Sequence, residues 1–225
     1  MKTLSIVFAF AATLFFLPSC KKAATSSPSS MEYQIQAINK TAIINQPVSP
    51  GSILWTSGTA SATMIKLEAK NSGSEQVEFK SNTAQQIDLF ASVAASLGNV
   101  SIPAGTYTEV EFRIEIAQSG SNPALQLNGQ FTSGTGVVTP VIFLVNSMID
   151  IKSEQTNVTV TDNSSATALT TLNLALLTSG ITQTMMNSAT HTGGTMIISS
   201  SSNANLYNII SNNLIQSHGV EVHHH

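Results

Sequence analysis

The segment from Thr108 to Ala117 constrains the fold of this chain more than any other. Its apolar residues occupy every second position and its charged residues the positions between them: Val110, Phe112, Ile114 and Ile116 alternate with Glu109, Glu111, Arg113 and Glu115. A strict period of two over this length predicts a β-strand with one buried face and one face in water. The turn residues 103–107, Pro-Ala-Gly-Thr-Tyr, lead into this strand.

Shorter alternating or apolar runs predict further strands on both sides of this segment. They are 33–38, 52–56, 60–70, 76–80, 86–90, 124–131, 137–151 and 157–161. The turn Asn71-Ser-Gly-Ser74 predicts a hairpin that joins 60–70 to 76–80. Pro140 indicates an edge or a bulge in its strand, because proline cannot donate a backbone hydrogen bond. Residues 91–97 fit either one helical turn or a loop.

The pattern changes after Asp162 and becomes partly helical. Residues 166–177 are apolar and rich in helix formers, and 181–189 continue as a helical stretch after Gly180. Residues 195–199 predict a strand. The segment 203–216 carries apolar residues at helical spacing, with Asn203 or Asn205 as its N-cap: these are Leu206, Ile209, Ile210 and Leu214.

These patterns predict a mainly β fold. We expect an antiparallel β-sandwich over 31–162 and a mixed, partly helical C-terminal region over 163–217 that packs on the sandwich. The tail 218–225 holds four of the five histidines. Clustered imidazoles can bind Zn, Cu or Ni. We prefer to interpret this tail as disordered, or as the remnant of a tag, and expect no metal there.

The N-terminus has the layout of an export signal. Lys2 precedes an apolar stretch over 4–17 that is too short for a comfortable membrane span. The closing Leu17-Pro-Ser-Cys20 resembles the lipobox of bacterial lipoproteins, in which the cysteine is acylated, typically with palmitate, and the peptide is cut before it. We expect 1–19 to be a signal peptide, Cys20 the lipid attachment site and 20–30 a flexible tether. The alternative is an ordinary secretory signal with an incidental cysteine.

A lipidated Cys20 predicts attachment to a membrane. Several acyl chains hold a protein stably on a bilayer, and Lys21 and Lys22 can contact anionic headgroups. We therefore expect a lipid-anchored protein of the bacterial cell envelope, at the outer membrane, and leave open whether it faces the periplasm or the surface. Because Cys20 is the only cysteine, the mature domain would have no disulfide, thiolate nucleophile or cysteine-type zinc site.

Charged residues are scarce in this chain. They make up 9% of it, with a net charge of −3, against about 25% in a typical soluble domain. Binding of DNA or RNA rests on many Lys and Arg contacts to phosphates, so we exclude nucleic acid as a partner. Serine, threonine and amide side chains keep the surface soluble instead, which is compatible with a glycan or protein partner.

One stretch resembles a known family. Ile87-Asp-Leu-Phe90, Leu97-Gly98 and 102–114 are similar to bacterial lipoproteins with a domain of unknown function, which carry Asp-Leu-Leu followed by Leu-Pro-Ala-Gly-x-Tyr. The resemblance covers roughly 33–160 and is sharp only within 87–116. It implies a β-sandwich and no activity. The Pro-Ala-Gly-x-Tyr turn is also similar to that of fimbrillin-type pilus lipoproteins, although no basic cleavage site precedes a donor strand here.

Residues that could carry chemistry are few. The sequence lacks a Gly-x-Ser-x-Gly elbow, a phosphate loop, a dinucleotide fingerprint and a His-Glu-x-x-His motif. Glu109, Glu111 and Glu115 would suit glycoside hydrolysis if another carboxylate faced them across a cleft, but strand alternation explains them as a solvent face. Asp150, Glu154 and Asp162 offer oxygen ligands for calcium without the spacing of a calcium loop.

Trp55, the only tryptophan, is the speculative ligand-binding residue. It fits either a sugar-stacking platform or an anchor of the core, and we prefer the core.

The function that we expect is that of a non-catalytic envelope lipoprotein, structural, adhesive or ligand-binding, with a glycan as one candidate ligand. We expect no enzyme activity, cofactor or metal. Two alternatives stay open. One is a hydrolase of envelope polysaccharide, and the other is a pilus-like subunit with an exchangeable edge strand, either the first or the last in the chain.

Overall fold

The computed structural model describes residues 29–44, 49–71 and 76–225. The predicted signal peptide, Cys20 and most of the predicted tether lie outside these residues. Among the described residues, no helix is long and apolar enough to cross a membrane.

Strands dominate the described chain, and helices occur only in its C-terminal part, as the sequence predicts. The strands are β1 (Ser29–Ile38), β2 (Thr41–Ile44), β3 (Gly51–Lys70), β4 (Gln76–Ser81), β5 (Gln85–Asp88), β6 (Ala95–Ile102), β7 (Gly105–Ile116), β8 (Leu125–Thr132), β9 (Val138–Val145), β10 (Ile149–Val160), β11 (Ser165–Asn173), β12 (Met196–Ile198) and β13 (His218–His224). The helices are the 3-10 helix η1 (Leu174–Thr178), α1 (Gln183–Asn187) and α2 (Ala204–Gln216).

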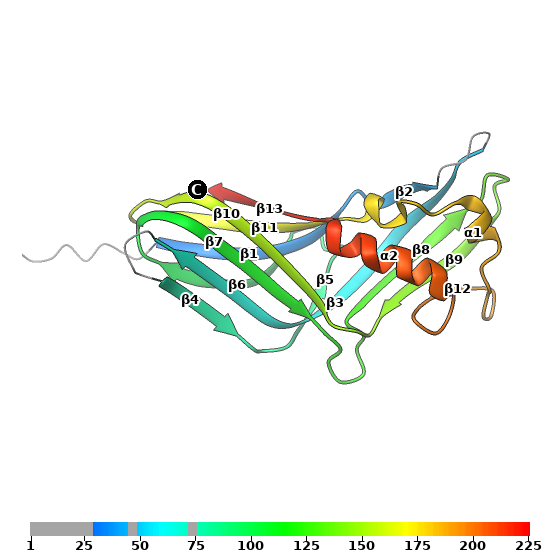
Figure 1. Ribbon diagram of the computed structural model, residues 1–225, viewed down its shortest axis with the longest axis horizontal. Helices are drawn as coiled ribbons and strands as arrows, with labels where there is room; N and C mark the ends of the chain where they lie inside the picture. Colours follow the sequence, from blue (N-terminus) through cyan, green and yellow to red (C-terminus); the bar gives the residue numbers. More distant parts are fainter. Residues whose placement is uncertain (1–28, 45–48, 72–75) are drawn as a thin grey trace, which may run out of the picture.

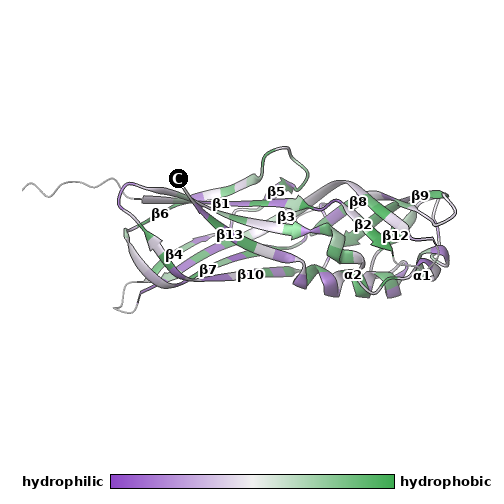
Figure 2. Ribbon diagram, turned by 90° about the horizontal axis from the view of Figure 1, so that it is seen from above, coloured by the Kyte–Doolittle hydropathy of each residue, from purple (hydrophilic) through white to green (hydrophobic). Residues whose placement is uncertain are grey.

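The molecule is elongated and has two halves that lie end to end (Figure 1). In one half, a four-stranded sheet with the order β13-β11-β1-β6 packs against strands β4, β3, β7 and β10 of a nine-stranded sheet. In the other half, β2, β3, β8, β9 and β12 of the large sheet are covered by η1, α1 and α2 (Figure 2). One continuous cluster of buried apolar residues runs through both halves.

Strand β3 belongs to both halves. Its buried residues fall at odd positions from Gly51 to Trp55, at even positions from Gly58 to Ala62, and at odd positions again from Ile65 onward. The register shifts after Trp55 against β8 and after Ala62 against β7. Each such bulge adds one residue and so moves the alternation by one. This is why the sequence analysis divided one strand of 20 residues into two.

Small residues form the middle of β3, where the two halves meet. Ala60, Ser61 and Ala62 are buried in succession, so both faces of the strand are covered there. A Cβ atom on Gly58 would lie 2.6 Å from Leu127 and 2.9 Å from Phe90. Larger side chains at these positions would push the neighbouring strands away from β3.

The four-stranded sheet brings together residues that are far apart in the sequence. Strand β1 pairs in parallel with β11 and antiparallel with β6, and β12 also pairs in parallel with β9. The sandwich is therefore not purely antiparallel. Tyr33 of β1 contacts Phe112 of the opposite sheet, with ring centroids 5.2 Å apart. Its hydroxyl accepts a 3.1 Å hydrogen bond from Thr170 of β11, and burial raises the pKa of Tyr33.

Several local predictions are confirmed. Strands β3 and β4 form the predicted hairpin. Strand β7 buries the apolar side of the alternating segment 108–117, and α2 follows the predicted helical spacing. Asn203 is the N-cap of α2, but its φ is 54° and its side chain makes no capping bond. Its amide and carbonyl groups instead bind Thr190 and Ile197, which joins α2 to the preceding loop.

Other predictions are wrong. Residues 165–173 form strand β11 rather than a helix, because their alternate side chains are buried between the two sheets and Thr residues suit a pleated strand. The predicted strand 137–151 contains all of β9 and the start of β10, and 157–161 belongs to the end of β10. Residues 95–102 form β6, where the sequence analysis expected no strand.

The C-terminal tail is also ordered, contrary to expectation. Residues 218–224 form β13, which pairs with β11 at the edge of the four-stranded sheet. Val220 and Val222 pack against the core. The predicted boundary after residue 162 therefore falls inside the sandwich, since the four-stranded sheet needs β11 and β13.

Truncating Phe112 tests the contact between the two sheets. This side chain is 0% exposed, so Phe112→Ala should lower the free energy of unfolding by about 3–5 kcal/mol, as expected for a large buried side chain. Val93→Ala, at a position that is 73% exposed, should change it by less than about 0.5 kcal/mol. Urea unfolding followed by circular dichroism measures both. Equal effects of the two variants would contradict the described packing.

Candidate functional site

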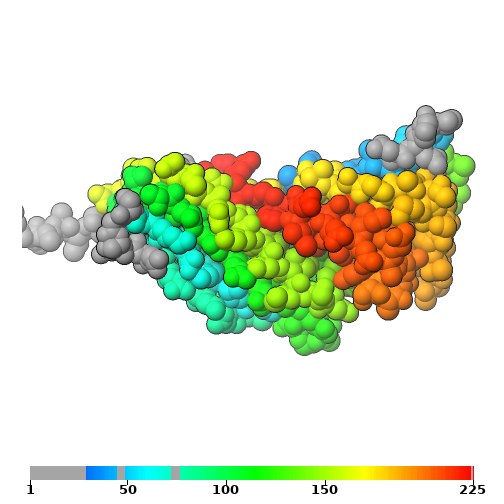
Figure 3. All heavy atoms as spheres, in the orientation of Figure 1, coloured from blue at the N-terminus to red at the C-terminus, as the bar shows by residue number. Residues whose placement is uncertain are grey.

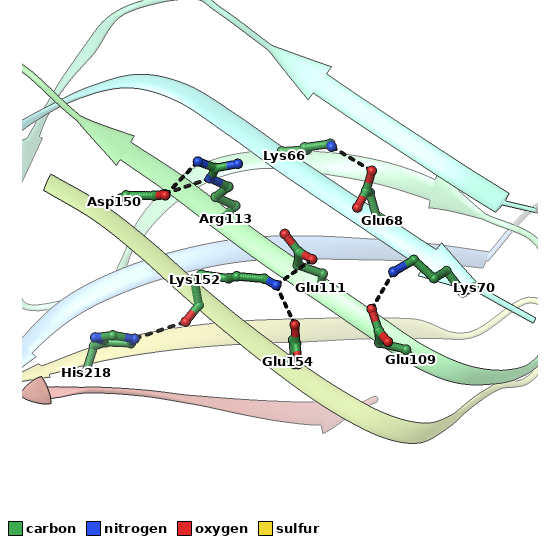
Figure 4. Close-up of polar contacts among 10 residues, drawn as sticks. All are labelled: Lys66, Glu68, Lys70, Glu109, Glu111, Arg113, Asp150, Lys152, Glu154 and His218. Atoms are coloured by element: carbon green, nitrogen blue, oxygen red, sulfur yellow. Dashed lines mark hydrogen bonds and ion pairs between the residues drawn. The ribbon is translucent and has the colours of Figure 1, made fainter. Parts of the chain in front are cut away.

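The charged residues of the described chain gather on one surface, which we name the charged face. It is the outward side of β4, β3, β7 and β10 (Figures 3 and 4). Among the described residues, it carries every lysine and arginine except Lys40 and most of the acids. The basic residues are Lys66, Lys70, Lys80, Arg113 and Lys152, and the acidic ones are Glu68, Glu78, Glu109, Glu111, Glu115, Asp150 and Glu154. The strict alternation of β7, in which the apolar side chains point inward, places its charges here.

Ion pairs connect neighbouring charges on this face. The ammonium of Lys152 lies 2.6 Å from a carboxylate oxygen of Glu154 and 3.1 Å from one of Glu111. The guanidinium of Arg113 binds both oxygens of Asp150, at 2.7 and 2.6 Å. Such bidentate pairs are the geometrically best defined ion pairs in proteins.

Two further pairs involve β3. Lys66 lies 2.6 Å from Glu68 on the same strand, and Lys70 lies 2.6 Å from Glu109 on β7 (Figure 4). Glu115 accepts a 2.9 Å hydrogen bond from Thr63.

These contacts shift the proton affinities of the groups involved. The hydrogen bonds that Lys152 donates to Glu154 and Glu111 raise the pKa of Lys152, and the bond from Lys152 lowers the pKa of Glu154. The same pairing raises the pKa of Lys66 and lowers that of Glu68. The two lysines, Glu68 and Glu154 therefore stay charged over a wide range around neutral pH.

Three carboxylates on this face lie close enough to share a cation. Oxygen atoms of Glu109, Glu111 and Glu154 lie within 4.8 Å of one another. The ammonium groups of Lys70 and Lys152 already bind these carboxylates. The arrangement is therefore a network of ion pairs, and a cluster of acids that is already paired with lysines is no cation site by itself.

The geometry does not match the alternative of a glycoside hydrolase. That reaction needs two carboxylates that face each other across a cleft, whereas Glu109, Glu111 and Glu115 lie on one side of a single strand. The suggested calcium ligands are not brought together either: among the described residues, the carboxylates that lie close to Glu154 are those of Glu109 and Glu111, not those of Asp150 or Asp162.

The structure places Trp55 in the core. Its side chain is 1% exposed, so neither face of the indole ring is available to stack on a sugar. Trp55 is therefore a residue of the core, and the suggestion that it stacks on a sugar is corrected. The indole N–H is buried and has no hydrogen-bond partner within the described ranges of the chain.

A polar hollow of about 480 Å³ lies on the outer side of the four-stranded sheet. The strand registers place Asn99, Glu32, Thr167 and His223 side by side across all four strands. His225 lines the same hollow, and its Nε2 atom lies 3.2 Å from the Thr167 hydroxyl. Carboxylate, amide, hydroxyl and imidazole groups thus share one concave surface.

The sequence analysis missed this hollow because it treated the tail as disordered. The alternation of Val220 and Val222 with Glu221 and His223 was the signal that could have revealed an edge strand. The pairing of β1 with β11, which brings Glu32 beside Thr167, could not be read from the sequence.

Comparisons with known proteins identify no relative of this chain. No family model, curated protein or solved structure matches the chain. The resemblance of 87–116 to lipoproteins with a domain of unknown function stays a prediction. Its Pro-Ala-Gly-x-Tyr turn has a clear local structure, in which the Tyr107 hydroxyl donates a 2.8 Å hydrogen bond to the carbonyl oxygen of Pro103.

The pKa shifts predict how one ion pair depends on pH. The pKa of Glu154 is lower in the folded chain than in the unfolded chain, so its stabilisation is present at neutral pH and is lost as pH falls through the folded value. Lys152→Met should therefore destabilise the protein at pH 7, and the difference from wild type should shrink toward about pH 2.5. Urea midpoints at the two pH values measure this.

The matched control is Lys80→Met, on the same face. Among the described residues, Lys80 forms no ion pair, so this variant should show little change with pH. A Lys152→Met deficit that is as large in acid as at pH 7 would mean that packing of the lysine stem, not its charge, is what matters.

Proposed function

We propose that this chain is a non-catalytic lipoprotein of the bacterial cell envelope, held at the outer membrane through Cys20, whose β module has a structural, adhesive or ligand-binding role. The observation that supports this most is the place where the described chain begins. Strand β1 starts at Ser29, at one end of the elongated molecule (Figure 1). Cys20 precedes it by nine residues, so a lipid anchor would hold this end within about 30 Å of the bilayer.

The polar hollow supports a ligand-binding role. Its volume falls within the range of about 300–1,000 Å³ that small-molecule sites occupy. Glu32, Thr167 and His223 offer acceptors and donors to a hydroxyl-rich ligand, and a glycan has this chemistry. The hollow includes Ser30 at the start of β1, so it would lie near the membrane.

One observation favours the pilus-like alternative. The last strand, β13, is an edge strand of the four-stranded sheet, which is the position that an exchangeable strand would occupy. The first strand, β1, lies between two others and does not have this property.

The anchor is tested by Cys20→Ser. Wild-type chain produced in a bacterium that is fed labelled palmitate should carry the label and sediment with membranes. The variant should lose the label and keep its leader. Lys21→Gln is the control that leaves the acceptor intact. Labelling of the Cys20→Ser variant would refute the proposal of a lipid anchor at this residue.

The hollow is tested on a glycan array with the full chain. Glycans that bind wild type should lose at least about tenfold in affinity with Glu32→Gln or His223→Gln, since each removes a charged or polar partner of the ligand. Glu78→Gln, on the charged face, should bind like wild type. Binding that survives both hollow variants would place the ligand elsewhere, and no binding to any glycan would favour a structural role.

A further inference from the structure

The charged face is ordered into rows of like charge. The strand registers place four glutamates directly beside one another across β4, β3, β7 and β10, and four basic residues beside one another in the adjacent row. The acidic row is Glu78, Glu68, Glu111 and Glu154, and the basic row is Lys80, Lys66, Arg113 and Lys152. Successive side chains on one side of a strand are about 7 Å apart, which is therefore the spacing of the two rows.

Strand pairing alone does not explain this order. Like charges directly opposite each other on adjacent strands are destabilising, and opposite charges would be favoured there. The chain instead compensates along the strands, as in the pairs Lys66–Glu68 and Lys152–Glu154. Such contacts restrain the side chains of both rows except Lys80, which forms no ion pair among the described residues. A partner that binds the rows therefore has to order few further side chains.

We propose that the charged face binds a second copy of this chain in the antiparallel orientation. A two-fold axis that runs between the acidic and basic rows, parallel to them, sets each acidic row over the basic row of the other copy. Every strand then faces the same strand of the partner, so Lys80 lies over Glu78 of the second copy, and Lys66 over Glu68. The two rows are complementary to each other in this orientation, whereas Glu115 lies over Glu109 of the second copy and weakens the contact.

The rows also exclude the parallel orientation. A two-fold axis along the strands would place acidic row on acidic row and basic row on basic row, and this juxtaposition costs free energy. The charged face lies in the half that carries the start of β1, so the antiparallel contact overlaps these two halves and leaves the β1 ends of the two molecules near the middle of the pair. Copies anchored to the same membrane can therefore form this contact; this consequence, unlike the contact itself, rests on the proposed function.

The contact should be weak and sensitive to salt. Four strands spaced about 4.8 Å apart and a few rows of side chains amount to roughly 400 Å² per copy, or about 800 Å² in total, which is less than the roughly 1,000 Å² that a stable specific interface buries. Its attraction comes from partly exposed charges, which salt screens. Many copies on one membrane would act together, because multivalency strengthens weak contacts.

The first experiment is sedimentation velocity of the full chain in neutral detergent. The dissociation constant of the dimer should rise at least about tenfold between about 0.05 M and about 0.5 M salt. A carbodiimide should then join Lys80 of one copy to Glu78 of another at low salt, in a mixture of isotope-labelled and unlabelled chains. A chain that stays monomeric at low salt, or that joins Lys80 to Glu154 of the other copy, overturns the proposal.

A variant that exchanges the two rows keeps the ion pairs within the sheet. It combines Lys80→Glu, Glu78→Lys, Lys66→Glu, Glu68→Lys, Glu111→Arg, Arg113→Glu, Lys152→Glu and Glu154→Lys with Asp150→Arg, which keeps the ion pair at position 113. This variant should dimerise with itself as wild type does, but mixed dimers with wild type should fall at least about tenfold below the random proportion, because like rows would then face each other. Native mass spectrometry of a mixture of isotope-labelled wild type and the variant measures the proportion of mixed dimers. Mixed dimers in random proportion would contradict the proposed contact. This result does not depend on whether Cys20 carries a lipid.

Discussion

The shared strand β3 is the constraint on which the rest of the structure depends. It pairs with β7 and β4 in one half and with β8, β5 and β2 in the other. Two bulges let its apolar side chains stay in the core along its whole length, and small residues at its centre let both faces be covered. The two halves thus share one hydrophobic core and one backbone element, so neither can be displaced without disturbing the other.

Charged residues are scarce, and their positions make the outer surfaces of the two sheets chemically different. In a chain with so few ionic groups, the outward positions of β3, β4, β7 and β10 carry most of them, while the outer side of the four-stranded sheet offers hydroxyl, amide and imidazole groups around one hollow. The two sheets therefore present different chemistry to their surroundings. One suits a partner with ordered charges, and the other suits a ligand rich in hydroxyl groups.

Sequence reasoning succeeded where a pattern is local. The alternation of β7, the hairpin turn before β4 and the helical spacing of α2 each depend on neighbouring residues, and each was found. It failed where the pairing of strands that are distant in sequence determines the local structure. Leucine and alanine in β11 suggest a helix until β1 and β13 are known to flank them. Likewise, the alternation of β7 placed its glutamates in water, but only the registers of four strands reveal that they belong to a single acidic row.

The position of β11 between β1 and β13 has a consequence for how the chain reaches its fold. The hydrogen bond between Tyr33 and Thr170 closes a loop of 137 residues, and the edge strand that completes this sheet ends one residue before the C-terminus. Contacts so distant in sequence make folding slow. The four-stranded sheet therefore cannot be completed until β13 is available, and until then the chain keeps unpaired strand edges that favour aggregation. Shielding these edges, or keeping the chain extended, until β13 can pair with β11 would suppress that aggregation.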